Sequence, residues 1–190
     1  MKPFRRRRAG SDEGLTMVEL VVVIAVGAIL SALIAGIFIS GLQSQTATRD
    51  RDVATGKAQL VADSLQTSLR NADGIRVDGN TLWAHVATGE SGWECRAWAL
   101  TDNGSLVYTH STSAIGAVDE SNGAKLISTQ DGLQGAAVSV SAIDGKPLFR
   151  EVDGQLAYAL AVTVGDATVR VAGSVAPQAR SEGTAPSCNQ

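Results

Sequence analysis

The stretch KPFRRRRAGSDEGLTMVELVVVIAVGAILSALIAGIFIS, residues 2–40, joins a short charged segment to a long apolar one. From Leu20 to Leu42 no side chain is charged, and a helix of this length extends about 34 Å, enough to cross a hydrocarbon core of about 30 Å. Lys2 and Arg5 to Arg8 precede the apolar run, so the positive-inside rule predicts a cytoplasmic N-terminus. We therefore expect a single-pass membrane protein whose C-terminal part is exocytoplasmic.

Gly14 stands before the apolar core, whereas a secretory signal peptide ends in small residues after its core. Glu19 is the only charged residue between Leu15 and Leu42. From Gly14 through LTMVE and the following apolar residues, the chain resembles the N-terminal motif of type IV pilins and pseudopilins, over roughly residues 8–45. The resemblance implies cleavage after Gly14 by a prepilin peptidase, N-methylation of Leu15, and use of Glu19 in fibre assembly. Leu15 departs from Phe, the commoner residue of the family at that position.

The alternative interpretation is a signal anchor in which Glu19 has no special role. An acid at the centre of a membrane helix costs about 2.5 to 3.5 kcal/mol on insertion scales, less near the interface, and such residues usually mark function. After cleavage, Glu19 would lie in the first turn of the mature helix, near the α-amino group of Leu15 of the same or an adjacent subunit. We interpret Glu19 as the charge that sets the register of a newly docked subunit.

Small residues recur at every fourth position of the same segment. This spacing stacks them along one helix face and is a common device for close association of membrane helices, although small residues are frequent in any such helix. The predicted helix-packing residues are Ala28, Ala32, Gly36 and Ser40.

A helical pattern continues beyond the membrane segment and ends near Asn71 and Gly74. Its apolar residues lie close to one stripe: Val53, Leu60, Val61, Leu65 and Leu69. After Gly74 the period changes to alternation. The clearest strand pair is a hairpin that runs from Leu156 to Val164 and resumes at Val169 after a Gly165–Asp166 turn. The other expected strands are 75–77, 82–87, 93–100, 106–110, 136–143 and 148–152, with a long loop over 111–135.

The expected fold class is α+β and pilin-like, with a long N-terminal helix, transmembrane in its first half, packed on one antiparallel β-sheet through Val61, Leu65 and Leu69. The expected parts are a cleaved basic leader, 1–14; a transmembrane or fibre-core helix, 15–42; an amphipathic continuation, 43–73; an antiparallel β-sheet domain, 74–176; and a flexible C-terminal tail, 177–190.

Composition excludes several classes of partner and chemistry. Removal of residues 1–14 takes away five of the 16 basic and two of the 19 acidic residues, which leaves 11 against 17 and a net charge of −6. No nucleic-acid partner is indicated. Cys95 and Cys188 are the only cysteines and would both be exported, so we predict a disulfide between them, with two free thiols as the alternative. His85 and His110 are isolated in expected strands.

No catalytic, cofactor or metal motif is present, so we expect a protein that is not an enzyme and needs no cofactor. The resemblance implies a minor pilin or pseudopilin of a type IV pilus-like or type II secretion-like fibre. Its partners would be the prepilin peptidase, other pilin subunits and the assembly platform membrane protein, and it would move from the cell membrane to a pilus or pseudopilus at the surface. The alternatives are a major pilin, or a membrane-anchored exocytoplasmic binding domain that never polymerises.

Overall fold

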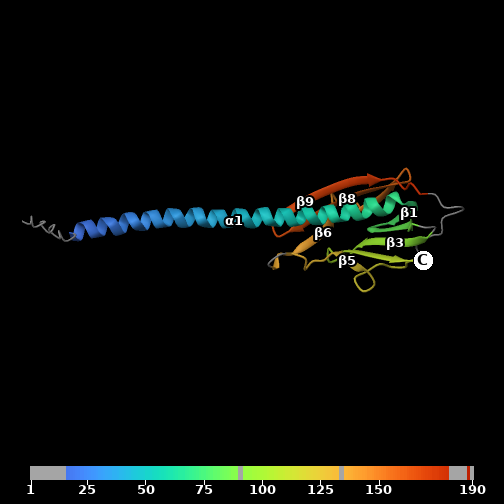
Figure 1. Ribbon diagram of the computed structural model, residues 1–190, viewed down its shortest axis with the longest axis horizontal. Coiled ribbons are helices and arrows are strands. Elements are labelled where there is room, and N and C mark those ends of the chain that lie inside the picture. Colours follow the sequence, from blue (N-terminus) through green and yellow to red (C-terminus); the bar gives the residue numbers. More distant parts are fainter. Residues whose placement is uncertain (1–15, 90–91, 133–134, 180–187, 189–190) are drawn as a thin grey trace, which may run out of the picture. The chain divides into compact units, whose positions relative to one another are not determined.

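The computed structural model describes residues 16–89, 92–132, 135–179 and 188. The chain divides into two compact units, Met1–Gln45 and Thr46–Gln190. One α-helix, α1 (Met17–Arg70), contributes residues to both; Figure 1 labels it together with several of the strands.

In the first unit, every described side chain is exposed. The large apolar residues from Met17 to Leu42 are between 49% and 87% exposed. This part of α1 is long and apolar enough to cross a membrane. A soluble protein rarely leaves so large an apolar surface uncovered, so the surface needs lipid or protein against it.

In the second unit, the end of α1 buries one stripe of side chains at intervals of three and four residues. Val61, Leu65 and Leu69 are fully buried, which confirms the predicted cover of the sheet. Leu60 was wrongly placed on this stripe. It is 44% exposed, because consecutive residues of a helix point about 100° apart and Val61 takes the inward position. The other buried positions of the stripe are Ala54, Ala58 and Ser68.

The helix ends at Arg70, three residues before the predicted boundary of its segment. Asn71 closes it, because the side-chain amide Nδ2 donates to the Thr67 carbonyl at 3.1 Å and the backbone N–H donates to the Ser68 carbonyl at 3.1 Å. The first strand then begins at Ala72 instead of after Gly74.

The next five strands form an antiparallel sheet in chain order: β1 (Ala72–Asp78), β2 (Thr81–Ala87), β3 (Trp93–Leu100), β4 (Leu106–Ser111) and β5 (Ala124–Ile127). β5 lies inside the stretch 111–135, which was wrongly expected to be all loop. Its strand pattern is hidden because it has only four residues and two of them, Ala124 and Lys125, are exposed. Ile127 pairs with Leu106 and is fully buried, which attaches β5 to the sheet.

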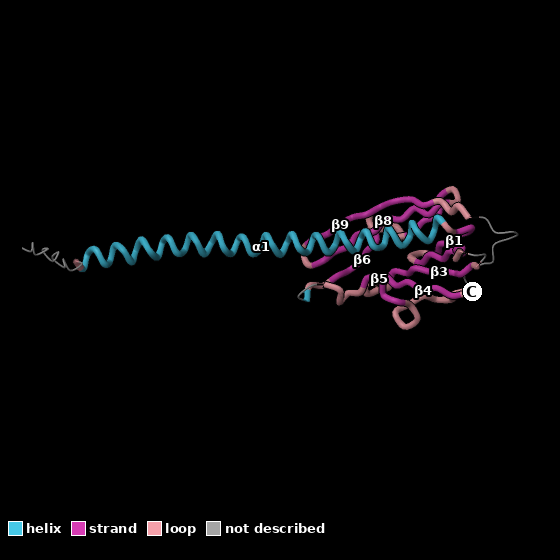
Figure 2. The backbone as a smooth tube through the Cα atoms, in the orientation of Figure 1, coloured by secondary structure: helices cyan, strands magenta, loops and turns pink. Residues whose placement is uncertain are grey.

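The last four strands form a second sheet, so the prediction of a single sheet is wrong. They are β6 (Val138–Ala142), β7 (Phe149–Val152), β8 (Gln155–Val164) and β9 (Ala167–Val175). β8 is the central strand of this sheet. All of β9 pairs with one edge of β8, and β6 and β7 share the other edge of β8. The β8–β9 hairpin with its Gly165–Asp166 turn was predicted, and Gly165 has a φ of +54°. Figure 2 shows the strands of both sheets along the end of α1.

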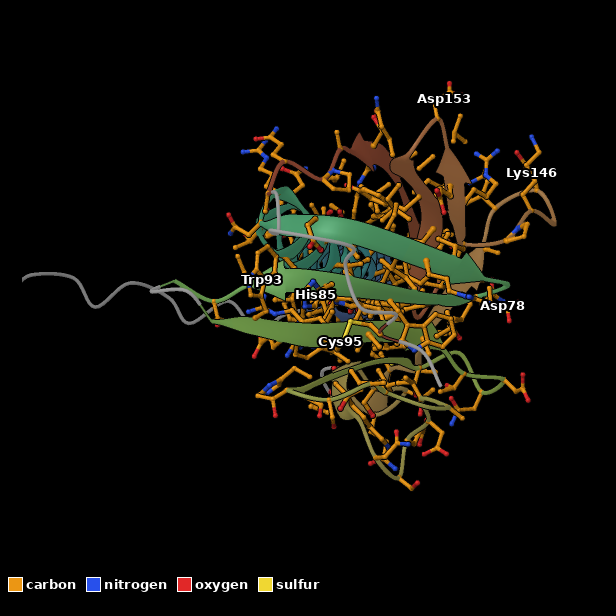
Figure 3. The ribbon with its side chains drawn as sticks, turned by 90° about the vertical axis from the view of Figure 1, so that its right-hand side faces the viewer. Asp78, His85, Trp93, Cys95, Lys146 and Asp153 are labelled. Carbon is orange, nitrogen blue, oxygen red and sulfur yellow. A yellow bond between two sulfur atoms is a disulfide. The ribbon has the colours of Figure 1, made fainter. Side chains whose placement is uncertain are left out.

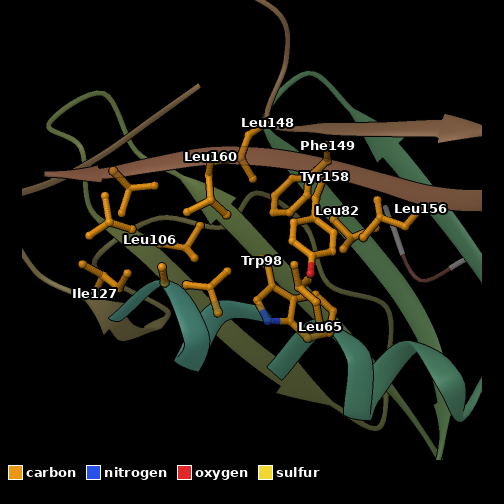
Figure 4. Close-up of a cluster of buried hydrophobic side chains, with 14 of the residues drawn as sticks. Leu65, Leu82, Trp98, Leu106, Ile127, Leu148, Phe149, Leu156, Tyr158 and Leu160 are labelled. Carbon is orange, nitrogen blue, oxygen red and sulfur yellow. The ribbon is translucent and has the colours of Figure 1, made fainter. Parts of the chain in front are cut away.

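Both sheets and the end of α1 share one apolar core. Figure 4 shows Leu65 of α1 beside Trp98 of the first sheet, with Tyr158 and Phe149 of the second sheet across from them. These side chains are at most 3% exposed. An α+β arrangement, with a helix packed on antiparallel sheets, is therefore established for this chain.

Candidate functional site

The N-terminal end of α1 carries the one acid of the apolar segment. The Glu19 backbone N–H donates to Thr16 Oγ1 at 3.3 Å, and the Leu20 N–H donates to the Thr16 carbonyl at 3.1 Å. Thr16 is therefore the N-cap residue, and Glu19 is the third residue of the helix, where the helix dipole favours a negative charge. This gives Glu19 a local role that needs no second subunit. The spacing Thr-x-x-Glu, a capping-box pattern, was readable in the sequence and was overlooked.

Gly14 and Leu15 lie outside the described residues, so cleavage after Gly14 and methylation of Leu15 stay predictions.

The four small residues Ala28, Ala32, Gly36 and Ser40 are all exposed. A Cβ atom added at Gly36 would meet nothing within 4 Å. Along this stretch Ser31 Oγ donates within the helix, to the Gly27 carbonyl at 2.8 Å. A larger residue at Gly36 would thus disturb no neighbour within the described chain, and the association role of this face stays a prediction.

Cys95 and Cys188 form a disulfide with their Cα atoms 5.4 Å apart. The bond attaches the C-terminal region to β3. Around it lies a small second core that contains Ala97 and Ile115, and the Ile115 N–H donates to the Cys188 carbonyl at 2.8 Å. Ala179 belongs to the segment that was expected to be a flexible tail. Its backbone N–H donates to the Ala72 carbonyl at 3.0 Å. Residues 180–187 and 189–190 lie outside the described residues.

His85 lies beside the disulfide, because it pairs with Cys95 across β2 and β3, and Figure 3 shows His85, Cys95 and Trp93 close together. It is not isolated. Its Nδ1 is 2.9 Å from Asp73 Oδ1, and the two side chains are 9% and 3% exposed. The ring stacks on Trp93 with centroids 4.7 Å apart. His110 also has an acidic neighbour, since its Nδ1 lies 3.5 Å from Glu94 Oε2.

Sequence reasoning missed the Asp73–His85 pair. The pair depends on an irregularity in β1 between Ala72 and Gly74, where the register with β2 shifts. This irregularity sets the position of Asp73 relative to His85, and no local sequence pattern announces it.

Asn103, Gly104 and Ser105 form a tight turn between β3 and β4. Asn103 Oδ1 accepts from the Ser105 N–H at 3.0 Å, and Gly104 has a φ of +85°. The Asn103 amide also donates to Glu120 at 2.6 Å. The pKa of Glu120 is lowered to about 2, mainly because Lys125 donates a hydrogen bond to its carboxylate and, next, because Asn103 does so. Across the described part of the chain, no three His, Cys, Asp or Glu side chains are grouped so that they could hold a metal ion.

No model of a known protein family matches the chain, and neither curated proteins nor solved structures give a match. The likeness to pilins therefore rests on the sequence motif around Gly14 and Glu19.

Proposed function

We propose that this chain is a structural subunit, a minor pilin or pseudopilin, of a type IV pilus-like or type II secretion-like fibre, and that it is not an enzyme. The observation that carries the proposal is the apolar surface of α1 from Met17 to Leu42, exposed on all sides, on a helix that continues into the core of a folded β domain. Lipid covers that surface before assembly, and the helices of other subunits cover it afterwards.

The orientation in the membrane follows from the charges, and the order of events is what the resemblance to pilins implies. The basic leader holds the N-terminus in the cytoplasm, where a prepilin peptidase removes residues 1–14, while the β domain lies outside. The assembly platform then extracts the subunit into the fibre. There Glu19 faces the α-amino group of a neighbouring Leu15, because a carboxylate removed from water needs a charged partner.

The competing function is a membrane-anchored binding domain that does not polymerise. The position of Glu19 in the first turn of α1 favours it, because the helix dipole stabilises an acid there without a second subunit. A major pilin is the alternative within the family, and abundance in the fibre would distinguish it from a minor one.

Processing tests the proposal most directly. The full chain is produced in cells with an active prepilin peptidase and assembly system, and membranes and sheared fibres are analysed by intact mass and N-terminal peptide mapping. We expect both fractions to begin at methylated Leu15. Gly14→Leu should retain residues 1–14, stay in the membrane and be absent from fibres. Gly10→Leu, a matched change in the same leader, should be processed normally. A native main form that still carries Met1 to Gly14 would contradict the proposal.

A further inference from the structure

A cavity of about 210 Å³ lies at the end of the first sheet, where β3 begins and β4 ends. Two neighbouring strands contribute His85, Trp93 and Cys95, and the chain after β4 contributes Thr112 and Ser113. None of these residues belongs to the helix on which the proposed function rests, so what the cavity binds is a separate question.

Two aromatic rings form one wall of the cavity. The rings of His85 and Trp93 are stacked with an interplanar angle of 11°. Asp73 contacts the Nδ1 atom of the His85 ring. Because a carboxylate oxygen accepts hydrogen bonds, Nδ1 of His85 is assigned as the donor of this bond. The buried Asp73 Oδ2 has no hydrogen-bond partner among the described residues. The stacking on Trp93 and the hydrogen bond to Asp73 together fix the orientation of the His85 ring.

The carboxylates near the cavity are already engaged. Glu94 lies on the cavity wall, and its Oε1 accepts from Arg96 Nε at 2.6 Å, with His110 Nδ1 3.5 Å from its other oxygen. Asp73 is bonded to His85. Glu94 is the one carboxylate among the described residues that line the cavity, and it is already paired with Arg96, so the cavity favours an uncharged ligand.

The chain after β4 adds two hydroxyl groups to the cavity wall, next to Ala114. Thr112 and Ser113 are exposed residues that line the cavity, and Ser113 Oγ lies 3.0 Å from Ser111 Oγ. Hydroxyl groups both donate and accept, so they match the hydroxyls of a polyol without regard to orientation. Apolar aromatic surface combined with a few placed polar groups is the usual composition of a small-molecule site.

We propose that this cavity binds one uncharged sugar ring of a saccharide. Trp93 packs against the C–H face of the ring, and the hydroxyls of Thr112 and Ser113 with Nε2 of His85 bond to its hydroxyls. A site for a single ring supports a dissociation constant on the order of 1 mM.

The test uses the full chain in micelles of lauryldimethylamine oxide, a detergent without a sugar headgroup. Methyl β-glucopyranoside, methyl β-galactopyranoside and N-acetylglucosamine are titrated, with binding followed by saturation-transfer NMR and tryptophan fluorescence. At least one should bind with a constant on the order of 1 mM. Glucuronate, choline and cyclohexanol, which add charge or lack the polyol, should bind at least about tenfold more weakly.

Variants locate the site. Trp93→Ala should weaken binding at least about tenfold, and Trp93→Phe should retain most of it by NMR. Thr112→Val with Ser113→Ala should weaken it about tenfold without disturbing the fold, because both residues are exposed. Thr168→Val, a matched change on β9, should have no effect. The proposal is overturned if no probe sugar binds up to about 50 mM, if the hydroxyl variant binds as wild type does, or if cyclohexanol or a charged probe binds equally well.

Discussion

Trp98 donates a hydrogen bond from its indole Nε1 to Ser64 Oγ at 3.1 Å, which joins β3 to α1 within the core. Trp98 is fully buried, so its N–H cannot turn to water. A serine between the apolar residues of the helix is thereby explained, because a buried indole N–H without an acceptor costs free energy.

Ser64→Ala should lower the free energy of unfolding by about 1 to 3 kcal/mol, because it leaves the Trp98 N–H unsatisfied. Urea unfolding followed by tryptophan fluorescence measures it, since all three tryptophans lie in the β domain. In a Trp98→Phe background the same serine change should cost less than about 0.5 kcal/mol. Equal costs in both backgrounds would show that the bond contributes nothing to stability.

Loss of the Cys95–Cys188 disulfide should destabilise the β domain. The bond closes a loop across a sequence separation of 93, for which chain-entropy models give at most about 4 to 5 kcal/mol. Comparison of the double Cys→Ala variant with the wild type by urea unfolding measures the loss. In exported wild-type protein the thiols should resist alkylation until a reductant is added, and full labelling without reductant would exclude the bridge.

The parts of the fold that were predictable from the sequence are local. The β8–β9 hairpin follows from alternating residues around Gly165–Asp166, and the cover of the sheets follows from Val61, Leu65 and Leu69 at helical spacing. Each pattern is complete within one or two neighbouring elements.

What could not be predicted depends on contacts between distant segments. β6 follows β5 in the chain but pairs with β8, and this choice separates the second sheet from the first. The buried Asp73–His85 pair depends on a register shift in β1. Of the candidate site residues, Cys95 and Cys188 could be paired only because the chain has no other cysteine.

An ion pair between Lys57 of α1 and Asp131, before β6, should give the β domain a pH-dependent increment of stability. Lys57 Nζ lies 2.7 Å from Asp131 Oδ2. That hydrogen bond, with a second from the Ser128 N–H, lowers the pKa of Asp131 below its ordinary value of 3.8. Because the folded pKa is depressed, the contribution is complete above pH 3.8 and disappears as the pH falls through the folded value.

A double-mutant cycle of Lys57→Met and Asp131→Asn isolates this contribution. Both side chains remain about a quarter to a third exposed, so the coupling at pH 7 should be only about 0.2 to 1 kcal/mol. It should approach zero once the pH has fallen below the depressed pKa of Asp131. A coupling that stays the same across this range would mean that Lys57 and Asp131 interact through packing and not through charge.

The two roles of Glu19, first-turn acid that complements the helix dipole and partner of a neighbouring subunit, predict different results for the same variants. Glu19→Ala should leave synthesis, insertion and cleavage after Gly14 largely intact, because removal of a charge makes insertion no harder. Incorporation into fibres should fall, since an uncompensated buried ammonium on the neighbour's Leu15 costs about 3 to 5 kcal/mol. The measurement is the ratio of sheared-fibre to membrane-bound protein. Glu19→Gln should resemble Ala, and Glu19→Asp should be intermediate because its charge has a shorter reach.

Thr16 supplies the matched control, because Thr16 Oγ1 is the acceptor of the cap bond to the Glu19 N–H. Thr16→Ala removes the cap, at a cost of about 1 kcal/mol to the helix end, but keeps the acid, whereas Thr16→Ser keeps both. If Glu19 pairs with a neighbouring subunit, Thr16→Ala should reduce the fibre ratio far less than Glu19→Ala. Equal losses for Thr16→Ala and Glu19→Ala would assign the acid to the cap alone. A wild-type ratio for Glu19→Ala would remove the assembly role and favour the membrane-anchored binding domain.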